Sequence, residues 1–196
     1  VSNSDFVGSV SKITPYNLSE IQIDGIDSKF VSFAKKLRTR FKKLEVFSIS
    51  GTYEEKVRKY LTGSTCQVIY GIFRTEKLQD SIILTRFIGH DWVEMLNILK
   101  FGDIHVVDEV LMCEYEVGRS SDGIIHNSII YNPGFFSVIF PWYPFTNECR
   151  KTLGRNLFFK NLDFFIKLNF EGILSQLIDI SRLIMKNCSK LKNNLF

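Results

Sequence analysis

Residues 89–115 read GHDWVEMLNILKFGDIHVVDEVLMCEY, and this stretch decides the expected fold. Gly89 opens the clearest helical pattern of the chain, which runs from about Asp91 to Phe101 and is closed by Gly102. Residues 104–115 follow at once and are rich in the β-branched and aliphatic side chains that strands favour. A helix that leads directly into a strand is a typical unit of an α/β sheet.

Upstream of this unit the sequence alternates between strand and helix patterns. Residues 7–13 alternate as a strand does and end at Pro15, and residues 45–50 predict a second, short strand. Thr52 and Glu55 have capping-box spacing, which predicts a helix over 53–61 that stops at Gly63. The apolar run 66–73 predicts a buried strand, and residues 74–78 a short helix or turn. A helix is also expected over 28–44, with six basic side chains opposite its apolar stripe.

Downstream the pattern changes to helices and aromatic residues. Residues 131–145 are apolar but interrupted by Pro133, Pro141 and Pro144, so they cannot form one regular helix. Residues 157–185 predict a helix with a break near Asn169–Gly172. We therefore expect an α/β domain over 1–121 and a helical, aromatic and basic tail over 122–196.

Composition excludes several protein classes. The 196 residues are 45% hydrophobic and 23% charged, which excludes a disordered or low-complexity chain. The net charge of +4 is too small to indicate nucleic-acid binding, and no nucleic acid is expected as a partner. Four cysteines without CxxC spacing favour a reduced, cytoplasmic protein over a disulfide or zinc framework. No apolar run reaches the roughly 18–20 residues of a membrane-spanning helix.

The order of motifs between Tyr70 and Ser121 resembles the acceptor-side half of family 2 glycosyltransferases, which are inverting enzymes of the GT-A fold. Tyr70, Gly71 and Arg74 match the family's first element, Asp91 and Trp92 its acidic motif at a helix start, and Gly102 its helix stop. The resemblance implies the α/β C-terminal half of a GT-A-like mixed sheet flanked by helices. It also implies transfer of a sugar from a nucleotide-sugar donor to a saccharide or lipid-linked acceptor with inversion.

By this resemblance Asp91 is the catalytic base. Inverting transfer needs a group that takes the proton of the acceptor hydroxyl as it attacks the anomeric carbon. A carboxylate in the first turn of a helix is stabilised by the helix dipole, so Asp91 is expected to stay ionised at neutral pH. The alternative is that Asp91 only caps the helix, as Asp often does.

The other candidate substrate-binding residues are Tyr70, Gly71, Arg74, His90 and Trp92. Arg74 could contact a diphosphate, or form a surface ion pair with Glu76 or Asp80. Trp92 could stack on a sugar ring or pack in the core. His90 could be a polar contact, a metal ligand or a structural residue. Gly71 could allow close backbone approach or mark a bulge.

The sequence departs from the family in one important respect, because it contains no DxD motif. The family uses that motif to bind a divalent metal on the donor diphosphate. Mg or Mn is therefore expected only in the complete enzyme, with ligands mostly outside this chain and no metal ligand within it. We expect the donor half to lie upstream of Val1, and this chain alone to be inactive.

The missing motif leaves a second interpretation open, in which the chain is a non-catalytic membrane- or protein-interaction module. The aromatic residues and lysines of 131–170 fit a peripheral membrane contact of an otherwise cytoplasmic protein, or packing of the tail over the sheet. The basic face of the helix expected at 28–44 is a solvated surface, or a contact for anionic headgroups or a phosphorylated acceptor.

Overall fold

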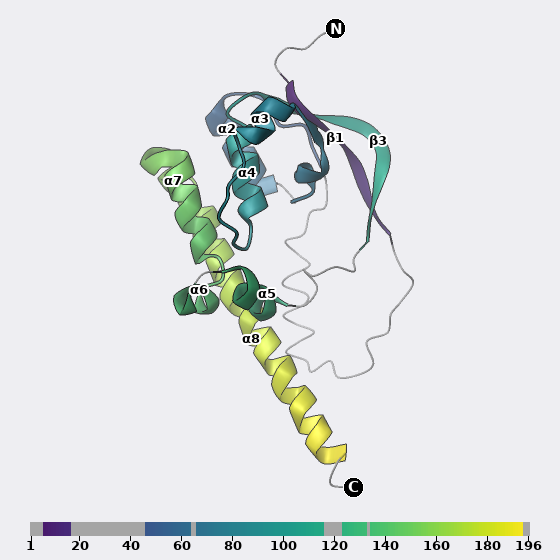
Figure 1. The fold of residues 1–196 in the computed structure, drawn as a ribbon, viewed down its shortest axis with the longest axis vertical. Coiled ribbons are helices and arrows are strands. Elements are labelled where there is room, and N and C mark those ends of the chain that lie inside the picture. Colours follow the sequence, from purple (N-terminus) through teal and green to yellow (C-terminus); the bar gives the residue numbers. More distant parts are fainter. Residues whose placement is uncertain (1–5, 17–45, 64–65, 116–122, 133, 194–196) are drawn as a thin grey trace.

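The computed structural model describes residues 6–16, 46–63, 66–115, 123–132 and 134–193 (Figure 1). The helix predicted over 28–44, with its basic face, lies outside the described residues. The described part is a mixed α/β structure with a small sheet flanked by helices, as the sequence predicts.

The sheet contains three strands: β1 (Phe6–Tyr16), β2 (Ile72–Phe73) and β3 (Asp103–Tyr115). Their order is β2-β1-β3, so the strand nearest the N-terminus is central. β1 pairs with β3 in parallel, with Val10 opposite Val106, and with β2 in antiparallel, with Gly8 opposite Phe73. Parallel strands need a long crossover, and here residues 46–102 lie between the two strands in the chain.

Five short elements, joined by loops, make up the described part of that crossover. They are α2 (Tyr53–Gly63), a 3₁₀ helix η1 (Cys66–Tyr70), α3 (Thr75–Gln79) and α4 (His90–Ile98), with β2 between η1 and α3. The predicted capping box is confirmed, because Thr52 N donates to Glu55 Oε2 at 2.8 Å and Glu55 N to Thr52 Oγ1 at 3.4 Å. The predicted helix at the Gly89–Gly102 stretch is also confirmed, with bounds of 90–98.

Two predicted strands are wrong or much shorter than expected. Residues 66–70 of the apolar run form η1, and only Ile72–Phe73 are a strand, because Gly71 N turns back to donate to Val68 O at 3.2 Å. A short apolar run fits a buried helical turn as well as a strand. Of the predicted strand 45–50, residues 46–50 are described, and among them only Ile49 forms a bridge, to Ile104. The Ser48 hydroxyl accepts a bond from Val106 N that a strand backbone would otherwise accept.

The C-terminal part consists of α5 (Ile124–Tyr131), α6 (Phe135–Ile139), α7 (Tyr143–Lys160) and α8 (Leu162–Asn193). The predicted interruption of 131–145 is confirmed, and Pro144 stands in the first turn of α7, where its missing N–H costs nothing. Helix geometry is lost at Gly154 inside α7 (φ 72°) and chain direction changes at Asn161, not at Asn169–Gly172.

The predicted break at Asn169–Gly172 is wrong because both residues have tertiary partners that suit a helix. The Asn169 amide donates to Phe165 O and to Thr146 Oγ1, each at 2.8 Å. A Cβ on Gly172 would lie 2.5 Å from Trp142 Cδ1, so glycine here allows a close helix contact and does not end the helix.

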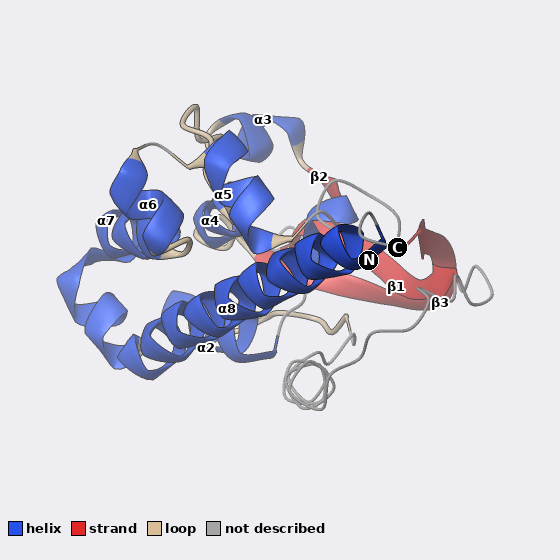
Figure 2. Cartoon of the chain, turned by 90° about the horizontal axis from the view of Figure 1, so that it is seen from below, coloured by secondary structure: helices blue, strands red, loops and turns tan. Residues whose placement is uncertain are grey.

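One hydrophobic core joins the sheet region to the C-terminal helices. It includes Val7, Val10, Ile49, Val57, Leu96, Ile98, Ile104, Phe145, Phe158 and Phe165. α4 packs on α7 beside the sheet (Figure 2). At the surface, Arg58 pairs with Asp163 and Lys160 with Glu54, both at 2.7 Å. α7 and the first turns of α8 therefore pack on the same core as the strands.

Two of the four cysteines have described side chains, and both are free. Cys113 is exposed on β3, whereas Cys149 is buried in α7 and burial raises the pKa of its thiol well above the usual value. A protonated, buried thiol behaves as a small apolar group, as expected for a reduced protein.

Lys56 offers a test of the packing between α2 and the start of β3. It is 6% exposed, and its Nζ donates to Gly102 O at 2.8 Å and lies 3.3 Å from Asp103 Oδ1. Lys56→Met keeps the aliphatic stem but removes both bonds, so we expect a loss of about 1.5–3 kcal/mol in the free energy of unfolding. Denaturant titration measures it. The control Lys160→Met breaks an exposed pair and is expected to cost less than about 1 kcal/mol; equal losses would contradict the assignment.

Candidate functional site

The start of α4 is set by a glycine that no larger residue can replace without strain. Gly89 precedes the helix with φ 82°, in the left-handed region. A Cβ there would lie 2.9 Å from Trp142 Cζ3 and 3.1 Å from Phe145 Cδ2. Gly89 O accepts the Trp92 N–H at 3.1 Å, which forms the first turn. The first turn of α4, with His90 and Asp91, is therefore held against the aromatic side chains of α7.

Asp91 lies in this first turn and is partly buried. Burial is the largest influence on its carboxyl group and raises the pKa above the usual Asp value. The charge of His90 and the backbone N–H groups of Trp92 and Asp91 act in the opposite direction but are smaller. The helix dipole was expected to favour the ionised form of Asp91. In the structure the loss of water has the larger effect, and the pKa of Asp91 is raised.

His90 is oriented by the loop before the helix. Its Nδ1 lies 3.1 Å from Phe87 O, and its ring meets the edge of the Phe87 ring at a centroid distance of 6.3 Å. Because a carbonyl oxygen only accepts, this contact is a hydrogen bond when Nδ1 carries the proton. His90 thus has a defined ring position beside Asp91.

Trp92 takes the core role that was one of its two expected alternatives. Its ring contacts Trp142, Phe145 and Phe164 at centroid distances of 5.8, 5.7 and 6.4 Å. These contacts link α4 to α7 and α8. Trp92 therefore supports the first turn of α4 from its apolar side.

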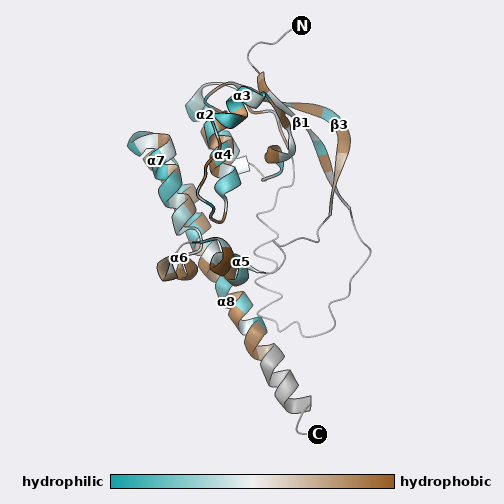
Figure 3. Ribbon diagram, viewed as in Figure 1, coloured by the Kyte–Doolittle hydropathy of each residue, from teal (hydrophilic) through white to brown (hydrophobic). Residues whose placement is uncertain are grey.

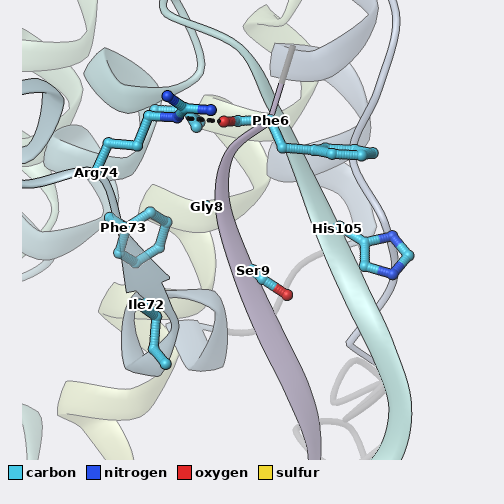
Figure 4. A pocket seen from close by; sticks show the side chains of 8 residues that line it. Phe6, Gly8, Ser9, Ile72, Phe73, Arg74 and His105 are labelled. Carbon is cyan, nitrogen blue, oxygen red and sulfur yellow. Dashed lines mark hydrogen bonds between the residues drawn. The ribbon is translucent and has the colours of Figure 1, made fainter. Parts of the chain in front are cut away.

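Arg74 lies at a different place, beside the sheet. Its Nε donates to Phe6 O at 2.8 Å and its backbone N to Val7 O at 3.0 Å, so it clamps the start of β1 (Figure 4). Neither expected acidic partner, Glu76 or Asp80, makes a salt bridge with it among the described residues. The guanidinium lines an open hollow of about 340 Å³. The other lining residues are Phe6, Val7, Gly8, Ser9, Ile72, Phe73 and His105.

Tyr70 and Gly71 precede β2 on the same side of the molecule as this hollow. A Cβ on Gly71 would lie 2.6 Å from Ser9 O, so the glycine permits the close backbone approach that was one of its expected roles. Tyr70 is 50% exposed. Tyr70, Gly71 and Arg74 thus flank β2 at one edge of the sheet, whereas His105, a residue for which the sequence predicted no role, lines the hollow from β3 at the other edge.

A second hollow, of about 310 Å³, lies between the loop before α4 and the start of α7. Its lining residues are Thr85, Phe87, Ser137, Tyr143, Pro144, Asn147, Glu148 and Lys151. Phe87 lines this hollow and also holds His90, which connects the hollow to the first turn of α4. The prolines that interrupt 131–145 were the sequence signal for such an irregular surface.

The predicted site residues therefore form two groups. Tyr70, Gly71 and Arg74 lie along the sheet edge, and His90, Asp91 and Trp92 form the first turn of α4. Asp91 lines neither of the two hollows. The described residues contain no group of three or more His, Cys, Asp or Glu side chains that could hold a metal ion.

The raised pKa of Asp91 predicts how stability should depend on pH. Its folded-state pKa is raised, so the stability linked to its protonated form is present below the ordinary Asp pKa and is lost as pH rises through the folded pKa. Asp91→Asn should therefore raise the melting temperature at pH 7 and give no gain at acidic pH, as measured by thermal unfolding across pH.

Asp163 is the control of opposite sign. The guanidinium of Arg58 lowers its pKa to about 2, so its contribution is present above the ordinary Asp pKa and lost as pH falls. Asp163→Asn should lower the melting temperature at pH 7. A destabilised Asp91→Asn at pH 7 would contradict the assigned burial cost.

Comparison with known proteins identifies no relative of this chain. No family model matches the sequence, and neither a curated protein nor a solved structure is significantly similar to it.

Proposed function

We propose that the chain is the acceptor-side part of an inverting glycosyltransferase that uses a nucleotide-sugar donor and a saccharide or lipid-linked acceptor. The observation that carries the proposal is the environment of Asp91. A carboxylate with a raised pKa stands in the first turn of a helix whose opposite side is buried in the core. A base works best when its pKa approaches the working pH and its position is rigid.

In the proposed reaction Asp91 accepts the proton of the acceptor hydroxyl. The hydroxyl oxygen forms a bond to the anomeric carbon from the face opposite the leaving group. The bond from that carbon to the diphosphate breaks, and the nucleoside diphosphate leaves with the electron pair. The charge of His90 lowers the pKa of Asp91 and so favours the ionised form, which is the form that accepts a proton. Arg74 is assigned to phosphate oxygens, because guanidinium groups bind them in a bidentate manner.

The family uses Mg or Mn at the donor diphosphate. The described residues offer no ligand cluster for such an ion, so no step is assigned to a metal on this chain. Of the residues named for the reaction, Asp91 and His90 act on the acceptor side, and Arg74 is assigned to the donor diphosphate.

The test of the base is Asp91→Asn in the full-length protein. Transfer from radiolabelled UDP-glucose, UDP-N-acetylglucosamine and GDP-mannose to a membrane-lipid extract and to oligosaccharides should fall about 10²–10⁴-fold. Binding of the sugar nucleotide, measured by calorimetry, should stay unchanged. Because Asn removes a burial cost, lost activity with retained thermal stability separates chemistry from folding.

The control for this variant is Asp80→Asn, at an exposed position just after α3, which should transfer at the wild-type rate. Asp91→Glu, which keeps a carboxylate, should recover part of the activity. Near-normal turnover of Asp91→Asn would remove Asp91 from the reaction.

A second candidate function is peripheral membrane contact through residues 131–170 and the neighbouring α5. Large apolar side chains are exposed there, and the ribbon is strongly hydrophobic at α5 and α6 (Figure 3). Phe135 is 82% and Phe136 54% exposed, with Ile129 and Ile130 on α5. None of the described helices is long and apolar enough to cross a bilayer. Apolar side chains beside lysines fit an interfacial contact instead.

Flotation with anionic and with neutral vesicles tests this contact. Phe135→Ser with Phe136→Ser should abolish flotation with anionic vesicles, whereas Ile82→Ser with Leu84→Ser, which changes exposed apolar residues between α3 and α4, should not. Absence of wild-type flotation would remove this candidate and leave the proposed base untouched.

A further inference from the structure

The hollow of about 310 Å³ between the loop before α4 and the start of α7 has polar side chains that the fold itself does not use. Ser137 is only 6% exposed, yet its hydroxyl makes no hydrogen bond within the described part of the chain. The half-buried amide of Asn147 and the more exposed hydroxyls of Thr85 and Tyr143 also make none with the described residues. Because buried polar groups are normally paired, unpaired groups around one hollow indicate a polar ligand.

One wall of the hollow is a flat aromatic ring whose orientation is fixed. Tyr143 is 45% exposed, and its ring stands perpendicular to that of Phe136 at a centroid distance of 5.0 Å. The Phe136 ring lies 4.8 Å from that of Phe140, so α6 holds the tyrosine ring from one side. An amphipathic ring of this kind packs against the apolar face of a sugar ring, whose hydroxyls then reach the polar groups around it.

The two charged residues of the lining neutralise each other. Lys151 Nζ donates to Glu148 Oε2 at 2.7 Å. A phosphate group would have to compete with Glu148 for the lysine, and an apolar ligand would leave the polar groups of the hollow without partners. A neutral ligand with several hydroxyls both donates and accepts hydrogen bonds, so it suits this lining. The hollow therefore favours a saccharide over a nucleotide or a lipid chain.

Phe87 connects this hollow to the candidate base. It lines the hollow, and its carbonyl oxygen lies 3.1 Å from Nδ1 of His90, the residue before Asp91. Asp91 itself does not line the hollow, so a sugar ring bound there is not the ring whose hydroxyl it would deprotonate. We propose that the hollow is a saccharide subsite that holds a non-reacting ring of the acceptor, an inference that rests on the proposed function.

The subsite sets a minimum size for the acceptor. Binding energy from a ring remote from the reacting hydroxyl is available only to an acceptor of two or more rings. We therefore expect the protein to prefer an oligosaccharide chain over a monosaccharide.

The first test measures binding to the full-length protein by calorimetry, with no donor present. The probes are maltotriose, cellotriose and chitotriose, with inorganic pyrophosphate as the anionic probe. We expect at least one trisaccharide to bind, and Asn147→Ala and Tyr143→Leu each to weaken its binding about 3–10-fold. The matched controls are Asn156→Ala and Phe159→Leu, at exposed positions of α7 outside the hollow, which should bind as the wild type does. Circular dichroism should show the same helix content for all four variants.

Two results would overturn the subsite. One is that none of the three trisaccharides binds to the wild type. The other is pyrophosphate binding that is lost in Lys151→Ala while Asn147→Ala leaves saccharide binding unchanged, which would assign the hollow to an anion.

A kinetic test separates the subsite from the proposed base. With an oligosaccharide acceptor, Asn147→Ala should raise the acceptor KM about 3–10-fold at nearly constant kcat, because it removes binding that is equal in the ground and transition states. Asp91→Asn should instead lower kcat. Saccharide binding that depends on Asn147 in a protein without transfer would remove the transferase and keep the hollow as a saccharide site. Transfer with an unchanged KM in Asn147→Ala would overturn the subsite and keep the transferase.

Discussion

The packing of Phe145 against two tryptophans is the contact on which the rest of the structure depends. Phe145 is fully buried, and its ring lies 5.7 Å from Trp92, 5.8 Å from Trp142 and 6.2 Å from Phe165. These four rings join α4, α7 and α8, and aromatic pairs of this kind add stability beyond the area they bury. A three-stranded sheet covers little apolar surface, so the strands need these helices to complete a core.

The same cluster sets the chemistry of the candidate site. A glycine is required before α4 because the Trp142 and Phe145 rings leave no space for a side chain at position 89. The next residues, His90 and Asp91, are then placed at the border between apolar packing and solvent, where a carboxylate loses part of its hydration. Such a group costs stability, and proteins commonly accept that cost at functional positions. A residue that only capped the helix would not need to be partly buried, so the burial of Asp91 favours a functional role over a simple cap.

α8 shows how one continuous helix can carry two apolar faces. Its buried face completes the core with Phe165 and Leu168, while a stripe of apolar side chains on the other side, from Ile166 to Ile184, is largely exposed. The contacts of Asn169 with Thr146 and of Gly172 with the Trp142 ring lie at the middle of the continuous helix. A break at that point, as the residue types alone suggest, would have divided the stripe into two unrelated patches.

The sequence by itself determined the elements whose signals are local: the Thr52–Glu55 capping box, the helix between Gly89 and Gly102, the long strand after it, and the interruption at the prolines. It also placed Asp91 at a helix start, whereas the roles of Asp91 and Arg74 rest on the resemblance to glycosyltransferases and stay a proposal. The tertiary structure decided that residues 66–70 form a 3₁₀ turn, that α8 continues through Gly172, that Arg74 holds Phe6 O, and that Trp92 packs in the core. The physical reason is the distance along the sequence between interacting residues. Caps and turns are formed by residues within a few positions of one another, whereas burial and side-chain pairing depend on partners dozens of positions away.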